Sequence, residues 1–490
     1  MKRKNILFGT LAVAAVTVGM IGCKKGITPA DKSHSLTAGV TATCDCSINP
    51  ATGGDSVISG QITTDLTLSN TKVYQLSGLV FVTGNHVLTI QPGARIEGLK
   101  GSGGNVGGGL IITRGSRLEA VGTPSCPIVF TSADPNPQSG DWAGVILLGN
   151  APTNNYPAFV EGINNTSYPN IDLVYGNSTP VANDNSGTLK FVRIEYGGYA
   201  LSLNNEINGL TLAGVGSGTT IDYVEVFKAN DDAFEFFGGT VNASHIIAVD
   251  ALDDMFDTDN GYSGTISYAL GMSDVNRPDQ SQSNGLESDN DGTGSTNQPF
   301  TNPSYNHLTI IGVPSATTAS TTTGGPSGTG KYGRAAHLRR GARFHIDNAI
   351  FMGFNYGVSL DGQLGNPTTP DAYFADISSI TNSFSAAFGT TVTPGVGPYS
   401  QESNGTAATG AGFSSSDAFL LKARNAGNTD YLSSNANIIG LVDPFNRGGG
   451  NGAANFIPDP VTSDAVDAGA FPGGTDWTNV VGCWNWTRYQ

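Results

Sequence analysis

Charged side chains are scarce in this chain. Only 64 of its 490 residues are Asp, Glu, Lys or Arg, and just 24 of these are basic. Helical bundles, coiled coils and doubly wound α/β folds use more charge together with much Leu and Ala, so this composition argues against them. A formal net charge of −16 argues against a nucleic-acid partner, because nucleic-acid-binding proteins gather Lys and Arg on one face. The sequence also lacks a nucleophile elbow, a phosphate-binding loop, a zinc motif and a dinucleotide fingerprint.

Long apolar runs are absent except at the N-terminus. Lys2, Arg3 and Lys4 precede an apolar stretch, residues 6–21, which is short for a membrane span and typical of an export signal. Residues 20–23, Met-Ile-Gly-Cys, resemble a bacterial lipobox, and this implies cleavage before Cys23 and lipidation of that cysteine. Ordinary secretory cleavage nearby, with Cys23 incidental, is the alternative. Removing residues 1–22 takes away three of the 24 basic side chains and none of the 40 acidic ones, which leaves a net charge of −19.

The segment after the lipobox has no hydrophobic period and is expected to be a lipidated tether, residues 23–58. Acyl chains on Cys23 would hold a soluble domain on a membrane without a spanning helix. We therefore expect an exported protein anchored to the outer membrane. The sequence leaves open whether the domain faces the periplasm or the outside.

Cysteine is rare, with five residues in all. Besides Cys23 they are Cys44, Cys46, Cys126 and Cys483, and an even number in an oxidising compartment predicts two disulfides. Cys44 and Cys46 are poorly placed to bridge each other, so we expect one to pair with Cys126 and the other with Cys483. A metal or redox site at residues 44–46 is the alternative, but no His cluster lies beside it.

Glycine is abundant, with 67 residues, and short β-rich runs lie between Gly, Asn and Pro. Residues 223–240 align without a gap on residues 245–262 at an offset of 22, and Phe256 and Asp257 match Leu286 and Glu287 at an offset of 30. One coil of a right-handed parallel β-helix has this length and these corners, and its coils stack at about 4.8 Å. Equivalent residues are therefore expected to form ladders along the helix axis.

Several phrases resemble a known group: GLTLAGVGSGTTI (209–221), DDAFEFFGG (231–239), FDTDNG (256–261) and NGLESDN (284–290). They are similar to the exported β-helix lipoproteins common in Bacteroidetes. The resemblance implies an all-β, single-stranded, right-handed parallel β-helix of the pectin-lyase-like fold with decorating loops, and a function that is generally unassigned.

The expected organisation is a signal peptide over residues 1–22, the tether over 23–58 and the β-helix over 59–490. Long loops at residues 150–185, 274–303 and 314–330 either decorate a binding face or are flexible. A short helix outside the coils is expected within residues 371–388. Trp477, Trp484 and Trp486 are expected to cap the last coil against edge pairing.

The candidate chemistry lies on a column of acids. The repeat places Glu235, Asp257 and Glu287 on successive coils, with Arg339 next and Asp361 as a possible continuation. Carboxylates about 5 Å apart repel each other unless a cation, a shared proton or an arginine compensates. Three explanations stay open: calcium, glycoside hydrolysis by paired carboxylates, and a structural ladder that Arg339 neutralises.

Calcium prefers hard oxygen ligands, and the repeat gathers many of them. The candidate calcium ligands are Asp231, Asp232, Asp253, Asp254, Asp257, Asp259, Glu287, Asp289 and Asp291. The candidate catalytic residues are Glu235, Asp257, Glu287 and Arg339, and a lyase would need Arg339, Arg340 or Arg343 as its base. Phe237 and Tyr262 are the aromatic candidates for stacking on sugar rings, because alternation places Phe234, Phe236 and Phe256 in the core.

We therefore expect a lipoprotein that binds glycan or acts as an adhesive module, with its acidic ladder stabilised by Ca²⁺ and no organic cofactor. The expected partners are the membrane, through Cys23, and a polysaccharide, and no nucleic acid. A polysaccharide hydrolase or lyase is one alternative, and a purely structural envelope protein is another.

Overall fold

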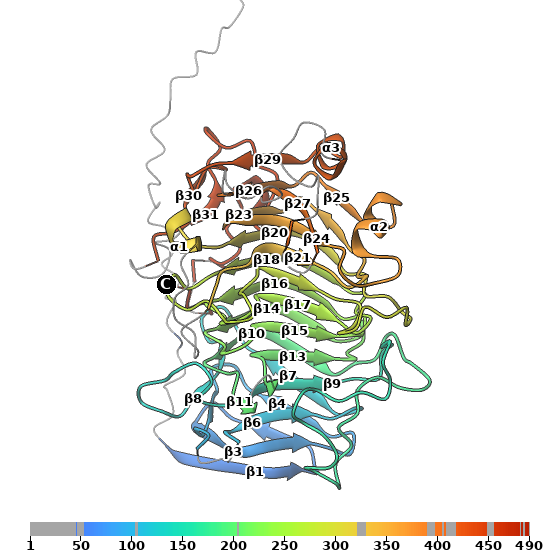
Figure 1. Cartoon of the computed structure of the whole chain (residues 1–490). Coiled ribbons are helices and arrows are strands. Elements are labelled where there is room, and N and C mark those ends of the chain that lie inside the picture. The colour runs from blue at the N-terminus through green and yellow to red at the C-terminus, as the bar shows by residue number, and fades with distance from the viewer. Residues whose placement is uncertain are drawn as a thin grey trace, which may run out of the picture. The chain divides into compact units, whose positions relative to one another are not determined.

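The computed structural model describes residue 46 and residues 53–102, 106–202, 205–320, 330–389, 397–403, 406–407, 418–447, 455–480, 482–483 and 486–489. Cys23, Cys44 and Trp484 lie outside these residues. Residues 43–490 belong to one structural unit, and its strands stack as successive coils from β1 to β29 (Figure 1). This is the expected all-β parallel β-helix.

Three parallel ladders build the β-helix. Ladder 1 contains β2 (Leu66–Leu68), β4 (Val87–Ile90), β7 (Arg117–Val121), the first halves of β10 (Gly187–Glu195), β14 (Thr220–Phe227), β16 (Asn242–Val249), β18 (Thr265–Met272) and β20 (Ser304–Ile311), then β22 (His345–Asp347) and β25 (Ser379–Thr381). Ladder 2 contains the first halves of β1 (Gly53–Ile62) and β3 (Lys72–Val82), then β5 (Arg95–Gly98), β8 (Ile128–Ser132), the second halves of the five long strands, β23 (Ile350–Phe354), β26 (Phe384–Ala387) and β29 (Thr429–Leu432).

Ladder 3 carries the candidate site. It contains the second halves of β1 and β3, then β6 (Gly109–Ile112), β9 (Gly144–Leu148), β13 (Leu210–Ala213), β15 (Phe234–Phe237), β17 (Phe256–Asp259), β19 (Leu286–Ser288), β21 (Arg334–Leu338), β24 (Tyr356–Asp361) and β27 (Tyr399–Ser403). Phe234 pairs with Phe256 and Phe256 with Leu286, so the offsets of 22 and 30 are confirmed. The first strand begins at Gly53, inside the segment expected to be the tether.

The interior is filled by the inward column of each ladder. Along ladder 3 this column includes Leu210, Phe234, Phe256, Leu286 and Val358, and each is fully buried. Each coil therefore covers the apolar side chains of the coil before it. The residues between them on the same strands, Glu235, Asp257 and Glu287 among them, point outward, and this alternation positions the candidate site.

Short elements decorate the coils. They are the antiparallel pairs β11 (Ala200–Ser202) with β12 (Asn205–Glu206), β27 with β28 (Thr406–Ala407) and β30 (Leu441–Asp443) with β31 (Asn455–Pro458), the helices α1 (Ala316–Ser320), α2 (Thr369–Phe374) and α3 (Ala418–Asn425), and the turn η1 (Pro472–Gly474). Helix α2 overlaps the start of the range expected for a helix, residues 371–388, but begins two residues earlier, and residues 379–387 form β25 and β26. In the described part of the chain, no helix has the length and apolar character that a membrane span requires.

An aromatic stack runs where ladder 1 meets ladder 2. Phe191, Tyr223, His245, Tyr268 and His307 each adopt a left-handed backbone, with φ between 50° and 57°, and this conformation bends each long strand. Successive rings stack with centroids 4.6, 4.4, 5.1 and 5.3 Å apart. The side chains at these bends therefore form a continuous column outside the core.

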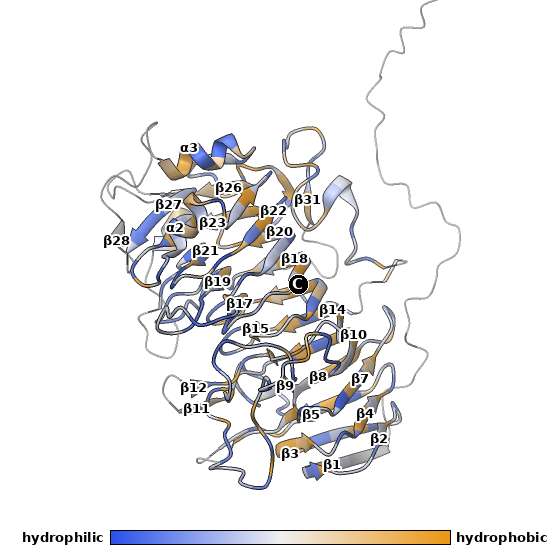
Figure 2. Cartoon of the chain, turned by 90° about the vertical axis from the view of Figure 1, so that its right-hand side faces the viewer, coloured by the Kyte–Doolittle hydropathy of each residue, from blue (hydrophilic) through white to orange (hydrophobic). Residues whose placement is uncertain are grey.

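The chain end does not cap the last coil. The C-terminal strap, which comprises residues 455–480, 482–483 and 486–489, returns to the flank of the coils, where Arg488 bonds to Glu225 on β14 and to Glu195 on β10 (Figures 1 and 2). Trp477 and Trp486 pack edge-on against Tyr223, with centroids 6.3 and 5.4 Å apart. The expectation of a tryptophan cap is wrong for these two residues, because both pack in the apolar cluster beside the aromatic stack.

A disulfide joins Cys46 to Cys126, with the Cα atoms 5.0 Å apart. Cys483 is disulfide-bonded as well. The Cys46–Cys126 bond ties the segment before β1 to the turn before β8.

Candidate functional site

The acidic column exists on the outer face of ladder 3. Glu235 on β15 pairs with Asp257 on β17, and Asp257 pairs with Glu287 on β19. The next member of the column is His337 on β21, not Arg339. Two residues separate the expected position from the observed one, because the sequence repeat ends at β19 and no repeated phrase fixes the register of β21.

A second column joins the turns that precede these strands. Asn208 Oδ1 accepts a hydrogen bond from the Asp232 amide (3.2 Å), and Asp232 Oδ1 accepts one from the Asp254 amide (2.8 Å). Asp254 Oδ1 accepts from the Asn284 amide (2.7 Å), and Asn284 Oδ1 accepts from the Arg334 amide (2.8 Å). Each side chain therefore fixes the turn of the next coil. Asp254 has this structural role and does not line the cleft described next.

An acidic cleft of about 580 Å³ opens beside these turns. Hydrophilic loops gather beside the ends of β15 and β17 in Figure 2. Eight carboxylate residues line the cleft, and no Lys or Arg does: Glu161, Glu206, Asp231, Asp232, Glu235, Asp253, Asp257 and Asp279. Two sets of three place their carboxylate oxygens within 4.8 Å of one another, and these are Asp231, Asp232 and Asp253, and Asp232, Glu235 and Asp257.

Burial and mutual repulsion raise the pKa values of the five cleft carboxyls that belong to the repeat, Asp231, Asp232, Glu235, Asp253 and Asp257. Burial raises the pKa of Asp257 well above its usual range, and the charges of Glu287 and Asp289 raise it further. Burial likewise raises the pKa of Glu235, with Asp257 adding to the shift. Asp257 Oδ1 is buried and has no hydrogen-bond partner among the described residues. The cleft therefore requires protons or cations at neutral pH.

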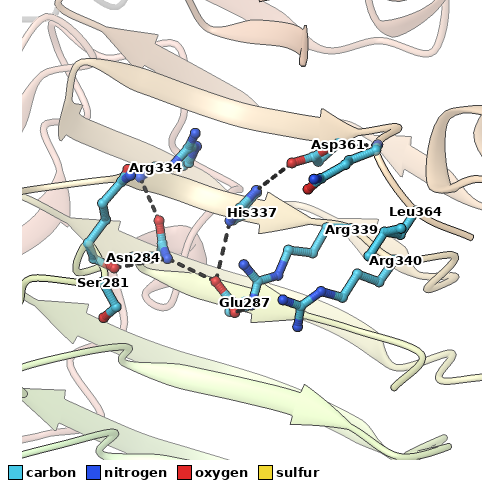
Figure 3. Close-up of a pocket in the computed structure, with 11 residues that line it drawn as sticks. Ser281, Asn284, Glu287, Arg334, His337, Arg339, Arg340, Asp361 and Leu364 are labelled. Carbon is cyan, nitrogen blue, oxygen red and sulfur yellow. Dashed lines mark hydrogen bonds and ion pairs between the residues drawn. The ribbon is translucent and has the colours of Figure 1, made fainter. Parts of the chain in front are cut away.

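A basic pocket adjoins the acidic cleft, and Ser281 lines both (Figure 3). Arg339 donates to Glu287 from Nη2 and to Asp289 from Nε (2.9 Å), and Arg340 donates to Asp289 (2.6 Å). His337 lies between two carboxylates, with Nδ1 3.3 Å from Glu287 and Nε2 3.5 Å from Asp361. The arginines and His337 thus neutralise the far end of the acidic column.

These ion pairs separate Glu287 from the rest of the column. Burial alone would raise the pKa of Glu287, but the charge of Arg339 and the hydrogen bond to His337 outweigh it and lower the pKa to about 2. Burial alone would lower the pKa of Arg339, but Glu287 and Asp289 hold it above its ordinary value. Arg339 therefore stays protonated and is unsuited to remove a proton from a substrate.

Not all of the expected calcium ligands reach the cleft. Asp231, Asp232, Asp253 and Asp257 line it, and Glu287 and Asp289 are engaged by arginines. Asp291 instead accepts hydrogen bonds from Thr293 and Ser295 in its own turn. Asp259 accepts from the Asn260 amide (2.5 Å) at the end of β17.

The two expected stacking residues are buried, so that prediction is wrong. Phe237 is 7% exposed, because residues 158–175 of the loop after β9 cover it, and Tyr175 stacks on its ring (5.9 Å between centroids). Tyr262 is fully buried against Phe236, and its hydroxyl donates to the Val241 carbonyl (2.8 Å). Strand alternation could not predict the loop that covers Phe237.

Sequence reasoning missed three cleft residues: Glu161, Glu206 and Asp279. Each comes from a loop or hairpin outside the repeat, so the repeat carried no signal for them. It also missed His337 as a member of the column, although the sequence placed this residue beside the arginines.

Residues 60–416 match the model of a family described as a pectate-lyase-like β-helix domain. No curated protein and no solved structure matches the chain.

Proposed function

Starting from the chain's membership of the pectate-lyase-like β-helix family, which settles the fold and leaves the chemistry open, we propose that the protein is a glycan-binding module whose acidic cleft holds calcium. The observation that carries the proposal is the convergence of eight carboxylate residues on one cleft that no Lys or Arg lines. Charges so arranged need a multivalent cation to stay ionised near neutral pH.

Calcium suits this cleft better than softer metals. The ligand atoms are carboxylate oxygens, and no Cys or His lines the cleft among the described residues. The ion would be held by five carboxylates, those of Asp231, Asp232, Glu235, Asp253 and Asp257. Asp257 Oδ1 has the greatest need of a cation, because it is buried and has no hydrogen-bond partner among the described residues. Bound calcium would supply positive charge to which hydroxyl or carboxylate oxygens of a sugar bind.

The rest of the cleft supports glycan as the ligand. Asn230, Gln280 and Ser281 line it beside the acids and offer neutral hydrogen-bonding groups. The pocket that follows adds Gln282, Asn284 and Gln363. A row of amides, a hydroxyl and a cation along several coils suits a chain of hydroxylated rings.

The proposal includes the membrane anchor. Cys23 lies outside the described residues, and its lipobox-like context supports export and lipidation of the mature N-terminus at the outer membrane. Mass spectrometry of the N-terminal peptide tests this part: an acylated Cys23 is expected, and an unmodified peptide starting elsewhere would contradict it.

Gel retardation tests the binding function. The mature protein is run through gels that contain one neutral or uronic polysaccharide, with calcium or with a chelator. We expect retardation by at least one polysaccharide with calcium and its loss in Asp232→Asn/Asp257→Asn. The matched control, Asp464→Asn/Asp467→Asn, removes two exposed acids and should behave as wild type. Binding that ignores both the chelator and the cleft variant would overturn the proposal.

Glycoside hydrolysis is a second candidate function. Asp257 and Glu287 lie side by side on paired parallel strands, and their pKa values are shifted in opposite directions. A protonated acid beside an ionised carboxylate about 5 Å away is the pair that a retaining glycosidase needs. Release of reducing ends from the same polysaccharides, lost in Glu287→Gln, would establish hydrolysis. Retardation without release would leave binding as the function.

A further inference from the structure

A small pocket with two cations lies beside the acidic cleft. It has a volume of about 240 Å³ and is lined by Pro137, Gln138, Ser139, Tyr196, Lys228 and Arg277. None of these residues is acidic, although the chain as a whole carries a net charge of −16. The pocket therefore has the opposite charge to its surroundings.

Both cations lack a carboxylate partner among the residues that the structure describes, where no salt bridge involves Lys228 or Arg277. Asp250, on the other side of Lys228, is paired with Arg447 (2.7 Å). The Asp274 carboxylate accepts a hydrogen bond from the Asn276 amide (2.7 Å). The two acids that line a neighbouring pocket together with Lys228 thus each have a partner of their own.

The backbone and neighbouring side chains fix the two cations. Lys228 follows β14 in a left-handed turn (φ 55°), and its ammonium lies 5.4 Å from the centre of the Phe227 ring. Arg277 donates from Nη1 to Ser139 Oγ (2.6 Å) and from Nη2 to Asn230 Oδ1 (3.4 Å). Because Ser139 Oγ accepts a hydrogen bond from Arg277, the Ser139 hydroxyl can donate its own hydrogen to a ligand in the pocket.

The pocket neighbours the acidic cleft. Asn230 lines the cleft, and its Oδ1 accepts a hydrogen bond from Arg277, which lines the pocket. A ligand that lies in the cleft can therefore place a substituent in the pocket.

We propose that Lys228, Arg277 and Ser139 form a subsite for a sulfate group on the glycan, which makes sulfated polysaccharide the substrate class of the proposed function. The Lys228 ammonium, the Arg277 guanidinium and the Ser139 hydroxyl would each donate hydrogen bonds to the sulfate from a different residue. A tetrahedral oxyanion accepts from several directions, whereas a planar carboxylate is matched by a single guanidinium.

The experiment compares three glycans of similar length, one sulfated, one uronic and one neutral, with the full mature protein in calcium. Calorimetry is expected to give a Kd for the sulfated glycan at least about tenfold below the neutral one. Lys228→Gln/Arg277→Gln should bring the affinity for the sulfated glycan to the level of the neutral one, with both measured on the same variant. The matched control, Lys72→Gln/Arg117→Gln, removes two exposed cations elsewhere and should keep the preference.

Three results would overturn the subsite: equal affinity for the sulfated and neutral glycans, a stronger preference for the uronic glycan, or a preference that survives Lys228→Gln/Arg277→Gln. A titration with inorganic sulfate separates this proposal from the glycan-binding function. If no glycan binds, the proposed glycan-binding function is wrong. Binding heat from inorganic sulfate that Lys228→Gln/Arg277→Gln abolishes would still support the subsite. If inorganic sulfate gives no binding heat, the subsite is contradicted.

Discussion

At the scale of single residues, Asp257 and Glu287 differ although they occupy one column. Asp257 is half-buried and Glu287 is buried, and burial by itself favours the neutral acid. Glu287 has Arg339 and His337 as partners, and Asp257 Oδ1 has none among the described residues. The partners, not the position in the ladder, therefore decide which carboxyl is ionised.

Arg339→Gln tests this difference. The substitution leaves Glu287 and Asp289 without their shared cation, and we expect a loss of about 3 kcal/mol in the free energy of unfolding at pH 7. The lowered pKa of Glu287 stabilises the fold above the ordinary carboxyl range, and this contribution disappears as the pH falls towards 2. Urea unfolding should therefore show a penalty that shrinks between pH 5 and pH 3.

Arg95→Gln is the matched control for that prediction. Arg95 also pairs with a carboxylate, Glu97 (2.7 Å), but its side chain is 48% exposed. A surface pair contributes at most about 1 kcal/mol. A loss of the same size in both variants would contradict the special role of Arg339.

Phe237→Ala tests whether Phe237 is a buried packing residue and not a sugar-stacking residue on the surface. Its ring packs under the loop after β9, so truncation should cost about 3 kcal/mol or more in the free energy of unfolding. Glycan retardation should stay as in wild type once the variant is folded. A stable variant that has lost glycan binding would restore Phe237 as a surface contact.

At the scale of elements, the C-terminal strap depends on a buried acid. The Arg488 amide donates to both oxygens of Glu225 on β14 (2.6 and 2.9 Å), and Arg488 Nη1 donates to Glu195 (2.6 Å). Burial raises the pKa of Glu225 to about 8, although Arg193 opposes the shift. The strap therefore covers a carboxyl that prefers to be neutral.

Glu225→Gln should change the pH dependence of stability. A folded-state pKa above the unfolded value stabilises the fold at low pH, and this contribution is lost as the pH rises through the folded pKa. We expect the stability of Glu225→Gln relative to wild type to rise by up to about 1.4 kcal/mol per pH unit between pH 5 and pH 8. Unfolding at several pH values measures this difference, and parallel curves for the two proteins would contradict it.

The ladders also show which elements a sequence can predict. The pairing of Glu235, Asp257 and Glu287 followed from the repeat, because each coil repeats both length and residue type. The register at His337 did not follow, since β21 comes after a long irregular insertion. The strap was missed because its partners, Tyr223 and His245, are distant in sequence and point outward from a bend that no motif predicts.

At the scale of the whole molecule, the sequence predicted the fold and five of the eight cleft carboxylates. Those five belong to the repeat (Asp231, Asp232, Glu235, Asp253 and Asp257), whereas Glu161, Glu206 and Asp279 reach the cleft from inserted loops. Loops of this kind carry no period, so only the folded chain brings them together. The central claim about the assembled cleft is that its surplus negative charge is balanced by calcium.

The most direct test is the thermal unfolding of the mature protein with calcium and with a chelator, at pH 7 and at pH 4. Raised pKa values mean that protons stabilise the cleft at low pH and are lost as the pH rises, so calcium is needed only at pH 7. Calcium at about 100 times its Kd adds about 2.7 kcal/mol, and we expect a melting temperature several degrees higher at pH 7, no shift at pH 4 and no shift in Asp232→Asn/Asp257→Asn. Identical melting with calcium and with chelator at pH 7 would contradict the account.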